Sequence, residues 1–257
     1  MILVAVADNS HTTFGAVAGS EITATWRVST DPSRTGDEWA MLVSSLVDSP
    51  LDQITGACLA STVPRVLQAW RQMLAGRFAG LQSVIVEAGV KTGLAIHTDN
   101  PREVGTDRIC NALAAVEMYG GPCVIVDFKG TATTYDVINA AGQYVGGAIT
   151  PGLELAVEAL GDHAAQLRRV ELARPRSAIA RNTTEALQSG LVFGTAAQVD
   201  GLITRLILEL GVARDQCRIV STGYHADLVT DECVSFTDSD PHLTLRGLAS
   251  IYDRNLR

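Results

Sequence analysis

Two apolar runs along the chain each end in a short polar turn that contains threonine. The first run covers residues 2–7 and the second covers residues 123–126, and a second strand is expected after each turn, at residues 14–17 and 135–138. Apolar runs of this length, bounded by turn residues, are typical of buried strands. The second copy begins about 120 residues after the first, close to half of the 257-residue chain. The pattern therefore predicts a duplicated α/β fold.

Apolar residues at helical spacing predict several helices between these runs. Residues 107–119 form the strongest case, because four apolar residues recur on one helical face: Ile109, Ala112, Leu113 and Val116. The pair Thr35 and Glu38 has the spacing of a capping box and predicts the start of a helix over residues 38–46. The same reasoning predicts helices over 64–74 and 245–255 and from residue 153, one or two long helices over 183–210, and strands over 83–87 and 217–221.

No segment of the chain is rich enough in proline or serine to predict a flexible linker between domains. We place the boundary of the duplication at Tyr119-Gly120-Gly121-Pro122. The expected domains are therefore an N-terminal half, residues 1–119, and a C-terminal half, residues 120–257.

Composition and charge exclude several classes of protein. Hydrophobic residues make up 47% of the chain and charged residues 19%, which excludes a disordered chain or a coiled coil. The net charge of −8 argues against a general nucleic-acid binder. No run of 18 apolar residues predicts a membrane span, and the N-terminus has the pattern of a strand instead of a signal peptide. Five scattered cysteines without a CxxC pair indicate reduced thiols in the cytoplasm, and no structural zinc is expected.

The two polar turns are the first candidates for chemistry. A strand that runs into a polar hairpin, once in each half, is one way to hold a nucleotide triphosphate. Backbone N–H groups and threonine hydroxyls donate to the phosphates, while a nearby aspartate holds the metal. An ordinary hairpin has the same pattern, so the turns alone do not decide the function.

A second candidate is the segment of residues 99–108, which crowds five charges around a proline and a glycine and then opens a helix. Asp107 and Arg108 fall at the helix N-terminus, where an aspartate often serves only as a cap. In the functional interpretation, Asp107 is a general base and Arg108 binds a carboxylate. Residues 146–152 are rich in glycine and are expected to form a turn before the helix at residue 153.

These segments, in this order, resemble the type III pantothenate kinase family, within the superfamily that joins acetate and sugar kinases with heat-shock chaperones and actin. The resemblance extends over nearly the whole chain and is carried by residues 26–30, 35–38, 89–94, 99–108, 146–152, 181–183, 186, 188–190 and 243–248. It implies two ribonuclease H-like (actin-like ATPase) halves, each a mixed sheet flanked by helices. It also implies ATP-dependent phosphorylation of pantothenate to 4′-phosphopantothenate in coenzyme A biosynthesis, by a cytoplasmic homodimer that uses Mg²⁺ and K⁺ or NH₄⁺.

The resemblance also implies roles for individual residues. Asp107 corresponds to the catalytic base, while Gly105, Arg108 and Thr183 correspond to residues that bind pantothenate, with Arg108 on its carboxylate. Asp127 corresponds to an aspartate associated with the monovalent cation. The nucleotide-binding positions lie in polar turns of both halves: Asp8, Asn9, Ser10, Thr12, Gly130, Thr131, Gly147 and Gly223.

Three nucleotide-side turns depart from the family pattern. The first loop of the family reads Asp-x-Gly-Asn-Thr-x-Thr, and here Val6 stands at its Asp and Asp8 at its Gly. Valine cannot coordinate a metal, and Asp8 brings a negative charge toward phosphate. In the second loop Lys129 is inserted after Phe128, which is expected to shift the hairpin register or form a bulge. This lysine is either looped out at the surface or a new cation near the phosphates. In the third turn, Tyr224 replaces a glycine and either fills the adenosine side or stacks on a base.

Because the substrate-side segments match while the nucleotide-side turns differ, three functions remain open. The first is a kinase with a rearranged ATP site. The second is a catalytically inactive homologue that binds pantothenate or a similar small carboxylate. The third is an enzyme that uses Asp107 and Arg108 on another acid without ATP.

Overall fold

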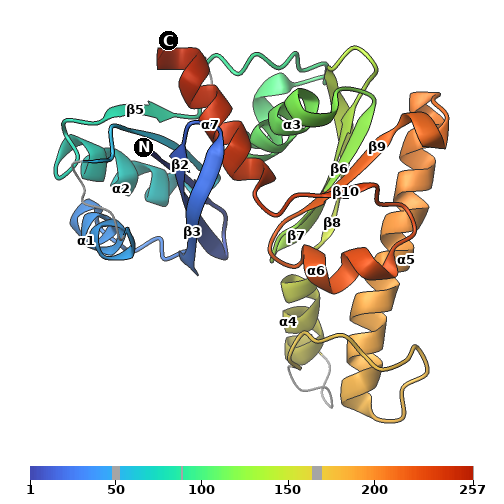
Figure 1. The fold of residues 1–257 in the computed structure, drawn as a ribbon. Helices are drawn as coiled ribbons and strands as arrows, with labels where there is room; N and C mark the ends of the chain where they lie inside the picture. The colour runs from blue at the N-terminus through green and yellow to red at the C-terminus, as the bar shows by residue number, and fades with distance from the viewer. Residues whose placement is uncertain (48–52, 88, 164–169, 257) are drawn as a thin grey trace. The chain divides into compact units, whose positions relative to one another are not determined.

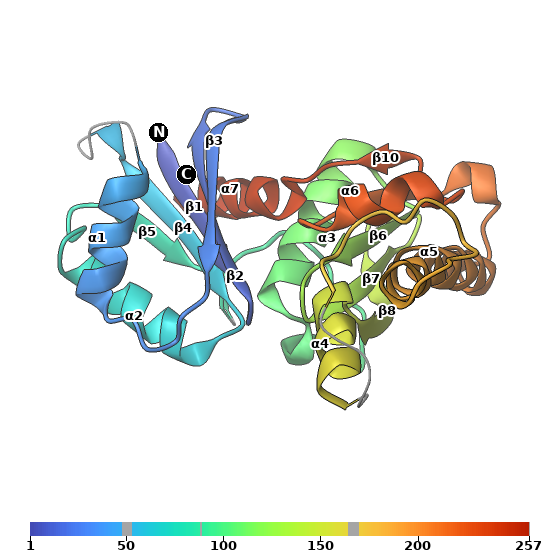
Figure 2. The same cartoon turned by 90° about the horizontal axis from the view of Figure 1, so that it is seen from below.

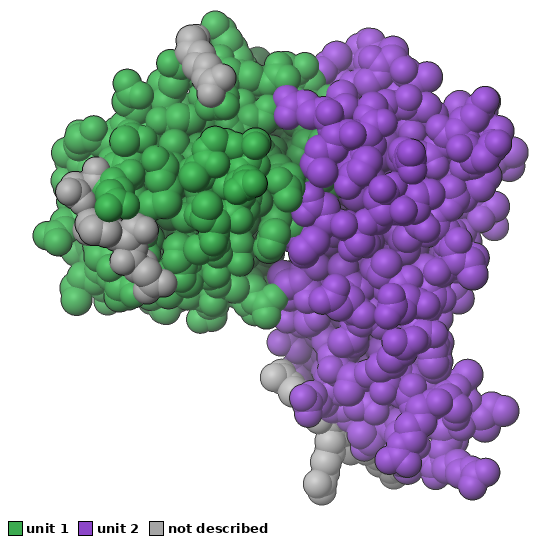
Figure 3. Space-filling view, viewed as in Figure 1, with its two compact units in different colours: residues 1–94, 99–114, 242–257 green, residues 95–98, 115–241 purple. Residues whose placement is uncertain are grey.

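The computed structural model describes residues 1–47, 53–87, 89–163 and 170–256 (Figure 1). These residues form two compact units, which Figure 3 colours separately. Unit 1 comprises Met1–Leu94, Asp99–Ala114 and His242–Arg257, and unit 2 comprises Ala95–Thr98 and Ala115–Pro241. The last helix of the chain thus belongs to unit 1, while the division into residues 1–119 and 120–257 stays a prediction about the duplicated halves.

Within the described residues, unit 1 is built on a five-stranded mixed sheet with the order β3-β2-β1-β4-β5. Its strands are β1 (Ile2–Ala7), β2 (His11–Ala18), β3 (Glu21–Ser29), β4 (Gly56–Ser61) and β5 (Gln82–Ile85). The β1–β2 and β2–β3 pairs are antiparallel, and the β1–β4 and β4–β5 pairs are parallel. The central strand β1 is mostly buried, as its apolar run predicts.

The described part of unit 2 repeats this sheet. Its order is β10-β9-β6-β7-β8, so β8, β7, β6, β9 and β10 take the places of β3, β2, β1, β4 and β5. Its strands are β6 (Cys123–Phe128), β7 (Ala132–Ile138), β8 (Tyr144–Pro151), β9 (Arg218–Thr222) and β10 (Asp238–Ser239). The β6–β7 and β7–β8 pairs are antiparallel, and the β6–β9 and β9–β10 pairs are parallel. Because both sheets share the same sequence of antiparallel and parallel pairs, the predicted duplication is confirmed.

Helices cover both faces of the sheet in unit 1 (Figure 2). Helices α1 (Gly36–Leu46) and α2 (Pro64–Ala75) pack on one face, where Phe14, Trp39 and Trp70 meet. The first part of α3 (Thr106–Tyr119) and α7 (Leu243–Leu256) pack on the other face. The predicted capping box is present, since the Thr35 side chain accepts a hydrogen bond from Glu38 N and Thr35 N donates to the Glu38 carboxylate.

In unit 2, helices α4 (Leu153–His163), α5 (Thr183–Leu210) and α6 (Ala226–Val229) form a core with strands β6, β7 and β9. Three 3₁₀ helices complete the described elements: η2 (Pro101–Glu103), η3 (Arg214–Gln216) and η4 (Thr230–Glu232). Helix α5 is long and apolar enough to cross a membrane by length and composition. A core helix passes the same test, and α5 buries Val192, Val199 and Ile203 in unit 2, so this feature is weak evidence for a membrane.

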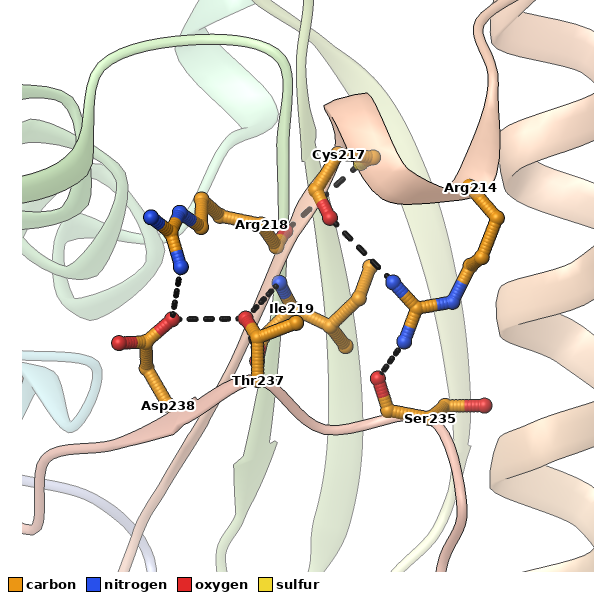
Figure 4. A network of polar contacts seen from close by, with 7 residues as sticks. All are labelled: Arg214, Cys217, Arg218, Ile219, Ser235, Thr237 and Asp238. Atoms are coloured by element: carbon orange, nitrogen blue, oxygen red, sulfur yellow. Dashed lines mark hydrogen bonds and ion pairs between the residues drawn. The ribbon is translucent and has the colours of Figure 1, made fainter.

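A network of polar contacts joins β9 to the segment that leads into β10 (Figure 4). Thr237 Oγ1 donates to Asp238 Oδ2 at 2.7 Å and accepts a hydrogen bond from Ile219 N at 2.9 Å. The Arg218 guanidinium lies 3.6 Å from the same Asp238 oxygen. These contacts fix strand β9, whose carboxyl end leads into the turn at Gly223.

The predicted helices are confirmed, and residues 183–210 form one helix. The prediction for residues 146–152 was wrong. Residues through Pro151 form strand β8, Gly147 pairs with Asp136, and only Gly152 lies between this strand and α4. Strand β8 lies at the edge of the sheet. Strands β3 and β4 were not predicted.

All five cysteines are free thiols. Burial raises the pKa of Cys58 and of Cys233 to about 12. These two thiols therefore stay protonated at neutral pH, where they are poor nucleophiles and poor metal ligands.

Candidate active site

The first polar turn, between β1 and β2, closes on its own aspartate. Asp8 Oδ1 accepts hydrogen bonds from Ser10 N and from His11 N, both at 2.7 Å. Asp8 N donates to His11 O at 3.0 Å and completes the turn. This is the bonding of an Asx turn, in which a carboxylate satisfies backbone amides two and three residues further along. The two amides that face Asp8 are thus already bonded to an anionic oxygen.

The other residues of this turn have different surroundings. Asn9 is exposed, whereas Thr12 is fully buried and its hydroxyl lies 2.9 Å from the Thr30 hydroxyl. Val6 is half-buried and packs against the apolar cluster of the α3–α7 face. The Val6 side chain therefore makes apolar contacts and cannot bind a metal, whereas the family pattern has a metal-holding carboxylate at this position.

The second polar turn, between β6 and β7, contains a buried ion pair. Lys129 Nζ lies 2.9 Å from Asp127 Oδ2, and the side chains are 13% and 1% exposed. Lys129 is therefore neither looped out nor solvated, and the first alternative for this residue was wrong. The pairing of β6 and β7 runs without interruption from Cys123–Ile138 to Phe128–Thr133, so no bulge lies in the paired strands, and a register shift relative to the family hairpin stays a prediction.

The two turns occupy equivalent places in their sheets. The last β1–β2 pair joins Ala7 to Thr12, and the last β6–β7 pair joins Phe128 to Thr133, so each turn has the same length. By this register Val6 corresponds to Asp127, and Asp8 corresponds to Lys129. One turn therefore carries an apolar residue and an anion where the other carries an anion and a cation.

Neighbouring segments of unit 2 enclose the second turn. Gly130 O accepts a hydrogen bond from Leu155 N, in the first turn of α4, at 3.2 Å. Phe128 O accepts one from His225 N at 3.3 Å. Gly223 has a φ of 94°, and a Cβ there would collide with Asp127 Oδ1 and with the Phe128 backbone. The Asp127 carboxylate is thus packed against a glycine whose conformation side chains rarely adopt.

Tyr224 belongs to a polar cluster beside Gly130. Its hydroxyl lies 3.5 Å from Glu154 Oε2, and His225 Nε2 lies 3.0 Å from Glu154 Oε1. The Tyr224 and His225 rings are 4.6 Å apart, and a Cβ at Gly130 would collide with both Glu154 and the Tyr224 hydroxyl. Tyr224 therefore fills the space over the turn at Gly130, and its role on the adenosine side stays a prediction.

On the substrate side, Asp107 is 7% exposed and lies in the first turn of α3. Its Oδ1 accepts a hydrogen bond from Arg108 N at 2.9 Å, and Arg108 itself is half-buried. Gly105 precedes the helix, and a Cβ there would come within 2.6 Å of Asp107 Oδ1. A carboxylate at a helix N-terminus is stabilised in its charged form by the helix dipole.

The predicted site residues thus form three groups, each described within its own unit. Unit 1 holds the first turn with Asp8, Asn9, Ser10 and Thr12, and separately the start of α3 with Gly105, Asp107 and Arg108. Unit 2 holds the second turn, where Asp127, Gly130, Thr131 and Gly223 come together. Gly147, in β8, and the exposed Thr183, at the start of α5, lie outside this turn.

Sequence reasoning missed Glu154 and His225. Each is unremarkable alone, since Glu154 is a first-turn acid of a helix and His225 follows the altered third turn. Only their shared contact with Tyr224 makes them part of the site. In the sequence, the departure at position 224 and the predicted turn at Gly130 pointed to this place, but not to Glu154 or His225.

Of the two kinds of metal ion implied by the resemblance, the described residues suit Mg²⁺ better than a monovalent cation. Among the described residues, no group of three or more His, Cys, Asp or Glu side chains forms a metal site. Mg²⁺ bound with a nucleotide is held largely by phosphates and needs only one or two carboxylates, so Asp8 Oδ2 can serve. A monovalent cation at Asp127 does not fit in the same way, because the Lys129 ammonium group already lies on that carboxylate.

The duplicated mixed sheets with paired turns define the class of protein. The ROK hexokinase from Thermus thermophilus has a TM-score of 0.53 at 13% identity and covers 97% of each chain. Component A of the (R)-2-hydroxyglutaryl-CoA dehydratase from Acidaminococcus fermentans has a TM-score of 0.56 at 12% identity, over 100% of this chain and 99% of that one. This is the fold of two ribonuclease H-like halves that actin-like ATPases and sugar kinases share.

Sequence comparison then identifies the family. The family model described as Type III pantothenate kinase matches residues 2–205. The type III pantothenate kinase of a Nocardioides species is 55% identical over 99% of both chains, and that of Thermobifida fusca is 50% identical over 99% of this chain and all of its own. The chain belongs to the type III pantothenate kinase family.

Proposed function

We propose that this protein transfers the γ-phosphoryl group of ATP to the primary hydroxyl of pantothenate, giving 4′-phosphopantothenate for coenzyme A biosynthesis in the cytoplasm. The observation that carries the proposal is the buried Asp107 at the start of α3, with Gly105 and Arg108 beside it, in a chain that matches pantothenate kinases from end to end. As in the family, a homodimer is the proposed assembly, with Thr183 near the substrate.

Asp107 and Arg108 have complementary roles in this proposal. The Asp107 carboxylate acts as a general base. It accepts the proton of the pantothenate hydroxyl while the hydroxyl oxygen attacks the γ-phosphorus. The Arg108 guanidinium binds the carboxylate of pantothenate. Because consecutive residues of a helix point about 100° apart, the two side chains address different parts of one ligand.

Each of the two polar turns offers donors to phosphate. Thr12 in the first turn, and Gly130 and Thr131 in the second, supply hydroxyl or backbone donors. Asp8 is the carboxylate that would hold Mg²⁺, which would neutralise charge developing on the phosphates. Gly223 keeps the third turn close to Asp127.

The test is direct detection of 4′-phosphopantothenate by mass spectrometry. The purified protein is incubated with pantothenate, ATP and Mg²⁺, beside Asp107→Asn and a matched control, Asp215→Asn, at an exposed position of unit 2. We expect product from the wild type and the control, and a loss of about 100- to 10,000-fold in Asp107→Asn. Equal turnover in the Asp107→Asn variant would remove Asp107 from the role of base.

A second candidate function, binding of pantothenate without phosphoryl transfer, is favoured by two features of the first turn. The amides of Ser10 and His11 already donate to Asp8, and Val6 supplies no carboxylate. In that case the wild type binds pantothenate in calorimetry but forms no product. The variant that combines Val6→Asp and Asp8→Gly with deletion of Lys129 then gains activity. Failure of this variant to form product, in a folded protein, would count against the second candidate.

A further inference from the structure

We propose that the Lys129 ammonium group is a built-in monovalent cation, which occupies the Asp127 carboxylate and makes this chain independent of K⁺ or NH₄⁺ at that site. The inference rests on the proposed function for the place of the site. Its tests need neither ATP nor pantothenate, so the two can fail separately.

Burial gives the first argument. Asp127 is 1% exposed, and a carboxylate removed from water in this way needs a partner of opposite charge. Lys129 Nζ supplies it at 2.9 Å, within the range of a charge-assisted hydrogen bond. An alkylammonium group carries the same single charge as K⁺ and N–H donors of the same kind as NH₄⁺, so it can neutralise the carboxylate as either ion does.

The chemistry of the residue gives the second argument. The chain has 20 lysines and arginines, and only two of them are lysines, Lys91 and Lys129. Arginine is a broad planar cation, while the lysine ammonium is compact and resembles a point charge. Almost all basic residues of the chain are arginines, yet the residue paired with the buried Asp127 carboxylate is a lysine.

The equivalent turn of unit 1 gives the third argument. It has the same length and register, but Asp8 stands at the position of Lys129 and Val6 at that of Asp127. There the carboxylate bonds to backbone amides of its own turn. The ion pair is therefore not a requirement of the hairpin backbone, and it occurs in the turn whose strand carries the buried carboxylate.

The first test uses NMR of the wild-type protein labelled with ¹⁵N at the lysine side chains. Two lysines give two signals, and Lys91→Ala assigns them. We expect the Lys129 ammonium protons to be protected from exchange with water, and the signal to stay in place when choline chloride is replaced by potassium chloride at equal ionic strength. A Lys129 signal that exchanges as fast as that of exposed Lys91, or that K⁺ displaces, would overturn the proposal.

The second test measures the melting temperature in the same two salts. The wild type and Lys91→Ala are expected to melt at the same temperature in choline and in K⁺ or NH₄⁺. Lys129→Ala, which leaves the buried carboxylate without its ammonium, is expected to melt roughly 6–15 °C lower in choline and to recover part of this loss in K⁺ or NH₄⁺. Lys129→Met, which keeps the length of the side chain, fills the space and is expected to recover less.

The outcomes separate cleanly. A wild type whose melting temperature rises in K⁺ as that of Lys129→Ala does would overturn the inference and leave the proposed kinase activity untouched. If both variants are too unstable to purify, the NMR titration of the wild type still decides. A protein that forms no phosphopantothenate but has a protected, K⁺-insensitive Lys129 would refute the proposed activity and support the built-in cation.

Discussion

The turns after β1 and β6 have the same length and strand register but different charged groups. Both connect antiparallel strands with the same register, and in both the strand leads from a buried apolar core into polar residues. In the first, the Asp8 carboxylate accepts hydrogen bonds from two amides of its own turn. In the second, the Asp127 carboxylate is paired with Lys129. The duplicated strand pairing thus fixes where each turn lies. The side chains in each turn determine which ions that turn can bind.

Breaking the polar contacts of the two turns is expected to lower the free energy of unfolding by different amounts. Asp8 is only half-buried, so the amides it releases can bond to water, and the loss is of the order of 1 kcal/mol. The Asp127–Lys129 pair is nearly excluded from water, and breaking a buried pair costs about 3–5 kcal/mol because one charge stays behind. Stability therefore depends on the second turn far more than on the first.

The largest expected effect comes from breaking the pair in the second turn. Asp127→Asn leaves a buried ammonium ion and is expected to lower the free energy of unfolding by about 3–5 kcal/mol, measured by urea denaturation. The double variant with Lys129→Met removes both charges and is expected to lose less than the sum of the single changes, with a coupling of at least about 1 kcal/mol. Additive losses would show that the two side chains are not energetically paired.

Gly223→Ala is expected to have the next largest effect, a loss of about 2–4 kcal/mol, because the added Cβ meets Asp127 and the φ of 94° is unfavourable for alanine. Gly19→Ala is the matched control, since Gly19 also has a positive φ of 63° but nothing within 4 Å of an added Cβ. Its expected loss is about 1 kcal/mol. If both variants lose the same, the packing of Asp127 against Gly223 does not matter.

A smaller effect, in activity, is expected from restoring the family pattern in the first turn. Val6→Asp combined with Asp8→Gly restores a carboxylate and frees the turn amides, and we expect kcat to rise by about ten-fold or more. Val6→Asn with the same glycine is the control, because it has the shape of aspartate without its charge. An equal rise in both variants would assign the gain to shape, and no rise would show that the first turn already serves the reaction.

The smallest effect on stability and on metal-free phosphate binding is expected from Asp8→Ala alone. It removes two hydrogen bonds at 2.7 Å, so it lowers the free energy of unfolding by about 1 kcal/mol and raises the affinity for inorganic phosphate several-fold. Asp31→Ala is the control, because Asp31 makes a similar turn with Ser33 N at 2.9 Å outside the candidate site. Phosphate affinity should respond to Asp8 only, and calorimetry measures it.

The sequence predicted the frame of the molecule well, because the frame depends on local patterns. The apolar runs gave β1 and β6, and the helical spacing from Asp107 gave α3. Strand β4 was missed, although it is buried, since its short run of small residues has no alternation or turn to mark it. Residues 146–152 were misread because glycines that suggest a turn lie in the edge strand β8.

The electrostatics of the site could not be predicted in the same way. The sequence indicated that position 129 was unusual, but a lysine two residues after a buried aspartate can point toward it or away from it. Burial settled the matter, with 13% of the Lys129 side chain exposed. The Glu154–His225 contact joins residues 71 positions apart, and no local pattern predicts such a pair.

The central claim is that the protein phosphorylates pantothenate while the Lys129 ammonium group takes the place of K⁺ or NH₄⁺ at the Asp127 carboxylate. The most direct measurement is the rate of 4′-phosphopantothenate formation by the wild type in choline chloride free of K⁺ and NH₄⁺, compared with the rate in potassium chloride of equal ionic strength. We predict product at the same rate in both salts. No product in either salt from correctly folded protein, or product only when K⁺ or NH₄⁺ is present, would contradict it.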